Sequence, residues 1–245
     1  EPAASTAVAT EPAPAAVIAE QAVKKTSSST ADHSKFDELK KDFKSGPEVT
    51  KACLGCHTEA AKQVHNTKHW TWEFLNPATK QKLGKKHVVN NFCTSVTSNQ
   101  TFGIACKGGM AEADNFDFTS ENNVDCVVCH DTTGKYKKIP SLSGHPNYKL
   151  MEWPPHSGRF REPTDLKTIA QKVGKTSRAS CGACHFYGGG GDAVKHGDLD
   201  SSLKQPKKYL DVHMDAKGLD FSCGKCHLSD SHEVTGSRSA PTAVD

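Results

Sequence analysis

The chain has 245 residues, a formal net charge of +3 and a hydrophobic fraction of 35%. That fraction is low for a chain of this length, so a core made of side chains alone would be thin. The lysines are scattered and form no basic stripe, which argues against nucleic-acid binding. No run of about 18 apolar residues is present that could span a membrane.

Residues 1–34 are rich in Ala, Pro, Ser and Thr, and such a segment cannot bury enough apolar surface to fold alone. We predict a flexible tail there and a single domain over 35–245. Apolar residues at helical spacing predict helices over 34–44, 47–72 and 165–173. Glycine and proline interrupt the chain between them, and no strand pattern persists. The expected fold is mostly α with long loops and little or no β structure.

The sequence C-x-x-C-H occurs four times, and this spacing is typical of covalent attachment of c-type haem. Two thiols add to the vinyl groups of one porphyrin, and the imidazole that follows reaches the iron. A zinc site usually needs four Cys or His ligands with paired spacings, and these motifs do not pair naturally. We number them motifs 1 to 4, and their predicted haem-binding residues are Cys53, Cys56 and His57, Cys126, Cys129 and His130, Cys181, Cys184 and His185, and Cys223, Cys226 and His227. We expect a core packed by these haems, in a multihaem cytochrome c.

The 10 cysteines include two outside these motifs, Cys93 and Cys106, and the second is followed by Lys107 where the motifs have histidine. Two interpretations stay open from the residues alone. One is a fifth haem c with Lys107 on its iron. The other is a Cys93–Cys106 disulfide with Lys107 as an ordinary surface residue, which would leave four haems.

The chain has 13 histidines, of which four belong to the motifs. Electron-transfer haems are often held by two histidines, so each motif histidine needs a distal partner. His65 lies eight residues after His57, about 12 Å along a helix, and cannot bind the other face of the same iron. His33 falls in the predicted tail and is not selected. The distal candidates are His69, His145, His196, His213 and His232, with His65 in reserve.

Cysteine-rich chains usually belong to an oxidising compartment, and covalent haem is also assembled outside the cytoplasmic membrane. The expected location is therefore the bacterial periplasm. The sequence shows no charged-then-apolar leader, so we expect any signal peptide to have been removed.

Several segments together resemble the octahaem tetrathionate reductase family of c-type cytochromes. They are residues 46–72, 90–93, 105–109, 116–134, 181–202 and 210–227. The resemblance implies a periplasmic multihaem enzyme with one lysine-ligated catalytic haem, related in haem packing to hydroxylamine oxidoreductase and pentahaem nitrite reductase. It assigns the lysine ligand to Lys107 and the thioethers to Cys93 and Cys106. The family has eight haems where this sequence offers five, so the chain is expected to be an N-terminal portion or a shorter relative.

The resemblance implies multi-electron reduction of a small sulfur- or nitrogen-oxo substrate, such as tetrathionate, nitrite or hydroxylamine. Haems with two histidines have no open position and carry electrons, while an iron held by Lys107 keeps one face accessible. Asp114 and Asp117 lie near this loop and are candidates for proton delivery. The expected partners are a small inorganic substrate and an electron-donor cytochrome. The competing hypothesis is a non-catalytic electron-transfer cytochrome that carries the Cys93–Cys106 disulfide.

Overall fold

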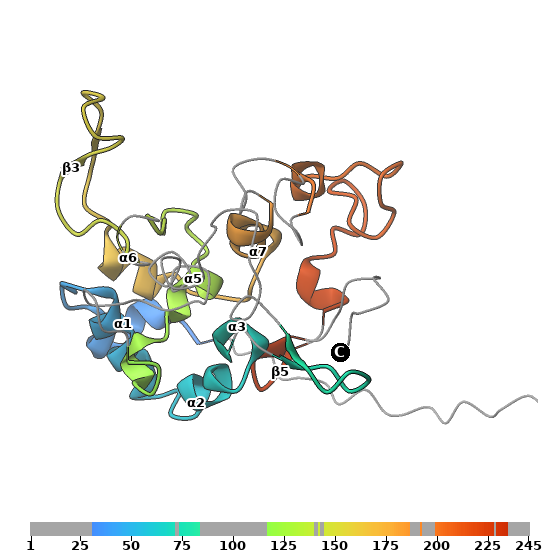
Figure 1. Ribbon diagram of the computed structural model, residues 1–245. Helices are drawn as coiled ribbons and strands as arrows, with labels where there is room; N and C mark the ends of the chain where they lie inside the picture. The colour runs from blue at the N-terminus through green and yellow to red at the C-terminus, as the bar shows by residue number, and fades with distance from the viewer. Residues whose placement is uncertain are drawn as a thin grey trace, which may run out of the picture. The chain divides into compact units, whose positions relative to one another are not determined.

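The computed structural model describes residues 31–71, 74–83, 117–139, 142, 145–186, 192, 199–227 and 229–234. The described residues from Asp32 onward belong to one compact unit. Its helices are short. They are η1 (His33–Lys35), η2 (Asp37–Leu39), α1 (Gly46–Leu54), α2 (Ala60–His65), α3 (Lys68–Thr71), η3 (Glu121–Asn123), α5 (Cys126–His130), α6 (Leu166–Gln171), α7 (Arg178–His185), η5 (Ser201–Lys204) and η6 (Cys223–Lys225) (Figure 1).

The strands form three antiparallel two-stranded hairpins of two residues per strand. They are β1 (Phe74–Leu75) with β2 (Lys82–Leu83), β3 (Met151–Glu152) with β4 (Phe160–Arg161), and β5 (Ser229–Asp230) with β6 (Glu233–Val234). The prediction of a mostly helical chain with long loops and little β structure is confirmed. No helix among the described residues is long and apolar enough to cross a membrane.

The single helix predicted over 47–72 is wrong, because the chain forms α1, α2 and α3 there. Cys56 and His57 both donate their N–H to the carbonyl of Cys53, which closes the first helix inside motif 1. After the second helix, the Thr67 hydroxyl donates to the Val64 carbonyl at 2.7 Å. Polar side chains that bond to nearby backbone in this way compete with helix continuation.

The predicted helix over 34–44 is likewise replaced by η1 and η2. The Asp32 carboxylate accepts from the Ser34 N–H and caps η1 at its start. The predicted helix over 165–173 is present as the shorter α6, whose cap is Asp165, accepting from the Thr168 N–H at 3.0 Å. A carboxylate cap of this kind satisfies an N–H that has no partner inside the helix.

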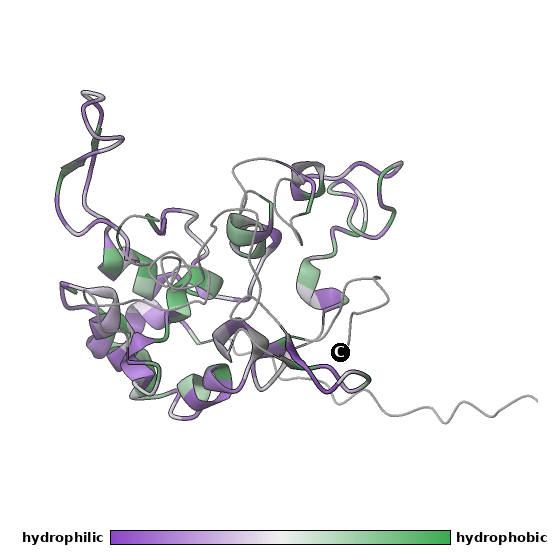
Figure 2. Cartoon of the chain, viewed as in Figure 1, coloured by the Kyte–Doolittle hydropathy of each residue, from purple (hydrophilic) through white to green (hydrophobic). Residues whose placement is uncertain are grey.

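The main apolar cluster joins α1, α5, α6 and η2, whose elements contact one another. Ile169 and Val49 are each 1% exposed and sit at its centre, with Val127 at 2%. The apolar positions of α5 and α6 appear as green ribbon in Figure 2. A second, smaller cluster consists of Ala61, Trp70 and Val124. Motifs 1 and 2 are therefore held by packed side chains, on the helices that build the core.

Candidate functional site: four Cys-x-x-Cys-His turns

Each of the four motifs folds as a helical turn. Motif 1 begins in the last turn of α1, and motif 2 coincides with α5. Motif 3 forms the C-terminal part of α7, and motif 4 contains η6. In motifs 1 and 4 the histidine N–H donates to the carbonyl of the first cysteine, at 2.8 Å for His57 and 2.9 Å for His227. Residues three and four apart share one face of a helix, so both thiols and the imidazole are presented together.

The thiols of these turns are available for attachment. All eight cysteines in the described part of the chain are free of disulfides. The second cysteine of every motif, Cys56, Cys129, Cys184 and Cys226, is exposed, and the first is half-buried. Cys129 keeps an exposed surface although protein atoms surround it closely, and this burial raises the pKa of its thiol to about 11. Free paired thiols beside an accessible imidazole fit covalent attachment of haem c.

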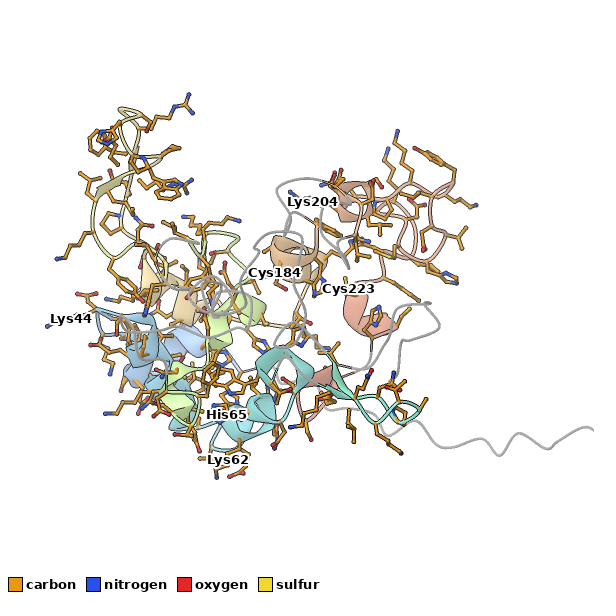
Figure 3. All side chains as sticks on the ribbon, in the orientation of Figure 1. Lys44, Lys62, His65, Cys184, Lys204 and Cys223 are labelled. Carbon is orange, nitrogen blue, oxygen red and sulfur yellow. The ribbon has the colours of Figure 1, made fainter. Side chains whose placement is uncertain are left out.

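The cysteines of neighbouring motifs interact with one another. A hydrogen bond with Cys53 is the first cause that raises the pKa of Cys126 well above its ordinary value, with burial second. The same kind of bond joins Cys181 to Cys223 and raises the pKa of Cys181. The charge of Cys184 also acts on Cys129. The four motifs thus form a string in the order 1, 2, 3, 4, and Figure 3 marks Cys184 and Cys223 from its last two members.

For three motif histidines, a second imidazole lies at the spacing expected across a metal ion. Ring centres are 6.3 Å apart for His130 and His232, 6.4 Å for His185 and His69, and 6.3 Å for His57 and His33. Two imidazoles that bind one metal from opposite sides, each through a nitrogen about 2 Å from it, hold their ring centres about 6 Å apart. The spacing of the ring centres in the three pairs therefore matches that expected for one iron between two imidazoles.

The pair of His130 and His232 is also oriented by its surroundings. The Nδ1 of His130 lies 2.8 Å from the Gly174 carbonyl, and the Nδ1 of His232 lies 2.7 Å from Oε1 of Gln63. Both partners are acceptors, so each Nδ1 donates and each Nε2 keeps its lone pair. Histidines that bind metals are commonly fixed in this way by a hydrogen bond at the other ring nitrogen.

The imidazoles of His69 and His232 are kept neutral. Burial lowers the pKa of His69, although part of the residue stays accessible, and burial followed by the charges of His130 and His57 lowers the pKa of His232. Neutral imidazole is the form that binds metals. Both residues were distal candidates from the sequence. His33 was not selected, because composition alone placed it in the tail, and the cap at Asp32 was the local signal that the fold begins earlier.

The remaining distal candidates are placed differently. His145 lies 2.6 Å from the Tyr148 hydroxyl through its Nδ1. His213 stacks on Phe221 and lies 3.8 Å from the Asp211 carboxylate, with 64% of its side chain exposed. His196 lies outside the described residues. His65 stacks on Trp70, and its Nε2 is a buried atom with no hydrogen-bond partner among the described residues.

The loop with Cys93, Cys106 and Lys107, together with Asp114, lies outside the described residues. Asp117 is described and fully exposed, and it accepts from the Thr119 N–H at 2.8 Å and from its hydroxyl at 2.6 Å. These bonds lower the pKa of Asp117. The role of Asp117 in proton delivery stays a prediction.

Comparison with known proteins yields a solved structure that resembles this chain over most of its length. It is the octahaem cytochrome c of Shewanella oneidensis, with 41% sequence identity and a TM-score of 0.69 over 85% of this chain. The chain spans 43% of the length of that cytochrome. An uncharacterised protein of Archaeoglobus fulgidus is 25% identical over 86% of this chain and 82% of its own length. No family model matches the sequence.

Proposed function

We propose, because the chain has the fold of a multihaem cytochrome c, that motifs 1 to 4 hold haem c and that the protein works in electron transfer and redox chemistry. The cofactor supplies a one-electron iron couple and a large apolar surface. The observation that carries the proposal is the pair of His130 and His232, whose ring centres are spaced for one iron and whose Nδ1 atoms donate to acceptors, so that each Nε2 keeps its lone pair for a metal.

The proposed ligands come in pairs. His57 pairs with His33, His130 with His232, and His185 with His69. Two imidazoles fill both axial positions, so these sites exchange electrons and do not bind substrate. The interactions among the motif cysteines support electron exchange along the string from motif 1 to motif 4.

We further propose that Cys93, Cys106 and Lys107 hold a fifth haem, at which a small sulfur- or nitrogen-oxo compound such as tetrathionate, nitrite or hydroxylamine is reduced. The support is the sequence, in which Cys106-Lys107 stands where the motifs have Cys-His. A lysine amine binds iron only without its proton, so the metal must compete with a pKa of about 10.4. The proposed location is the periplasm, and the proposed partner is an electron-donor cytochrome.

The mass of the intact protein tests the number of haems. Five covalent haems are expected. Four haems, with a mass two hydrogens lower for a Cys93–Cys106 disulfide, would contradict the fifth site and leave an electron carrier. A Lys107→Ala variant tests the catalytic claim, because it is expected to lose turnover of the reducible substrate while the sites at motifs 1 to 4 keep their spectra. Full activity in that variant would overturn the role of Lys107.

Replacement of one distal histidine tests the pairing. We expect His232→Ala to convert one haem from the low-spin to the high-spin spectrum without loss of covalent haem, because the thioethers at motif 2 remain. The matched control is His213→Ala, since His213 is exposed and stacks on Phe221. An unchanged spectrum in His232→Ala would contradict the assignment.

A further inference from the structure

A buried carboxylate stands directly before motif 2. The side chain of Asp125 is 0% exposed. It accepts from the Tyr136 hydroxyl at 2.9 Å and from the Lys138 ammonium at 2.8 Å, and it caps α5 by accepting from the Val128 N–H at 3.3 Å. The Lys138 side chain is itself only 10% exposed. This is a buried ion pair, unlike a solvated pair such as Asp37 with Lys40.

The chain makes a dedicated turn to bring these groups together. Asp131, which follows the histidine of motif 2, accepts from the Thr133 N–H at 2.8 Å and from the Tyr136 N–H at 3.0 Å. The turn sends the chain back along α5, so that Tyr136 and Lys138 reach Asp125 at its other end. Motif 2 is therefore bracketed by two aspartates that fix the same loop.

A buried ion pair adds little to the stability of the fold, since the loss of hydration offsets much of the attraction between the two charges. What burial does provide is a strong local field, because few water molecules screen the charges. A thiol of motif 2 responds to these charges. Burial first, and then the charge of Asp125, raise the pKa of Cys129, whereas the charge of Lys138 acts to lower it.

The same two charges must act on the oxidation state of an iron bound at motif 2. One electron added to the iron reduces its positive charge by one and requires no bond to form or break. A nearby carboxylate opposes that addition, and a nearby ammonium favours it. Burial and neighbouring charge are established means by which a protein adjusts the potential of a haem.

We propose that Asp125 and Lys138 adjust the reduction potential of the haem at motif 2 in opposite directions, with Asp125 favouring the oxidised iron and Lys138 the reduced iron. Tyr136 positions the carboxylate and draws off part of its charge through the hydroxyl hydrogen bond. The inference rests on the proposed function, since it requires a haem at Cys126, Cys129 and His130. It concerns positioning and charge, and it makes none of these three residues a ligand.

The test is a redox titration of the full chain with its covalent haems, with electrons supplied by a chemical reductant. Asp125→Asn is expected to raise the midpoint potential of one haem, and Lys138→Gln is expected to lower it. The matched control is Asp37→Asn, which makes the same change of charge in the exposed pair with Lys40 and is expected to leave every potential unchanged. Shifts in the same direction, or none, would overturn the proposal.

A third variant guards against a loss of folding in Asp125→Asn. Tyr136→Phe keeps the ring in the core and removes only the hydroxyl, so the less neutralised carboxylate is expected to lower the potential, by less than Lys138→Gln does. An upward shift or no shift in both of these variants also counts against the proposal. The mass of the intact protein distinguishes a failure of the proposed function from a failure of this inference. A wild-type chain without haem at motif 2 refutes the proposed function, whereas intact haem with unmoved potentials refutes only this inference.

Discussion

The region of motifs 1 and 2 and the region of motif 4 support the same five-residue signature in different ways. Around motifs 1 and 2, the described helices bury Val49, Val127 and Ile169 almost completely. Across 199–227, by contrast, Pro206 alone among these described residues is buried. Tyr209 there is 85% exposed and Leu219 61%. The region of motifs 1 and 2 therefore has a core of buried side chains, whereas in the region of motif 4 the apolar side chains are largely exposed.

Backbone turns and single polar side chains organise the C-terminal region instead. Asp211 accepts from the N–H groups of His213 and Met214, and Asp215 accepts from that of Lys217. Such turns fix local backbone but bury little apolar area, which is the main source of folding free energy. We infer that the haem proposed at motif 4 would supply the apolar surface that its region lacks, whereas motifs 1 and 2 fold largely on protein contacts.

Removal of one haem at a time is the strongest test of this contrast. Cys223→Ser/Cys226→Ser is expected to abolish amide protection across 199–227, because nothing else there fills a core. Cys53→Ser/Cys56→Ser is expected to leave protection in α5 and α6 largely intact. Hydrogen exchange with mass detection measures both, and the intact mass must show one haem lost in each variant. Equal loss of protection in the two variants would erase the distinction.

A cavity created in the core tests how much the buried side chains of the first region contribute to stability. Ile169→Ala removes a side chain that is 1% exposed between α1, α5 and α6, and we expect a loss of about 2–5 kcal/mol in the free energy of unfolding. Leu210→Ala, at a residue 46% exposed in the C-terminal region, is expected to change it by less than about 0.5 kcal/mol. Denaturant unfolding of both holoproteins measures the difference. Similar losses would mean that the C-terminal region has a side-chain core after all.

The link between α7 and the C-terminal region has an intermediate expected effect. Arg178 donates to the Met214 carbonyl at 2.6 Å and to the Phe221 carbonyl at 3.2 Å, and it pairs with Asp220. Arg178→Met removes these bonds, and we expect local opening of 211–223 to become easier by about 1–3 kcal/mol.

Native-state hydrogen exchange reports that local opening. The control is Lys35→Met, which breaks an exposed pair 3.7 Å long with Asp32 and should change little. Unchanged exchange over 211–223 in the Arg178 variant would show that the link adds nothing to the cohesion of this region.

The sequence predicted those features that depend on local spacing. The cysteines of each motif are three residues apart, one helical turn, and the structure does present them on helical turns. The apolar pattern over 165–173 predicted α6, although the cap at Asp165 was seen only in the structure. The helix predicted over 47–72 was wrong because side-chain bonds such as that of Thr67 end helices that periodicity would continue.

Features that depend on long-range pairing were harder to find. The sequence named His232 and His69 among several histidines, but their partners, 102 and 116 residues away, could be matched only in space. Likewise, the sequence did not single out Asp125, because only the turn after His130 brings Lys138 to it. Spacing along the chain carries no information about such contacts unless both partners lie on one element.

The smallest expected effect comes from a matched pair of helix caps. Asp165 caps α6 in the core region, and Asp200 caps η5 in the C-terminal region by accepting from the Ser202 N–H at 2.8 Å. Asp165→Ala is expected to reduce the free energy of unfolding by about 1 kcal/mol. Asp200→Ala is expected to leave that quantity unchanged and to speed exchange only in its own turn, because η5 is not coupled to a buried cluster.

The stabilising effect of each capping carboxylate is also expected to depend on pH. Hydrogen bonds from Thr168 lower the pKa of Asp165, and those from Ser202 lower the pKa of Asp200. A carboxylate with a lowered pKa in the folded state stabilises the fold above its unfolded pKa and loses that effect as the pH falls through the folded value. The difference between wild type and Asp165→Ala should therefore vanish in acid. Stability curves against pH for both variants measure this, and a global loss of about equal size in Asp200→Ala would mean that the C-terminal region unfolds together with the core rather than by itself.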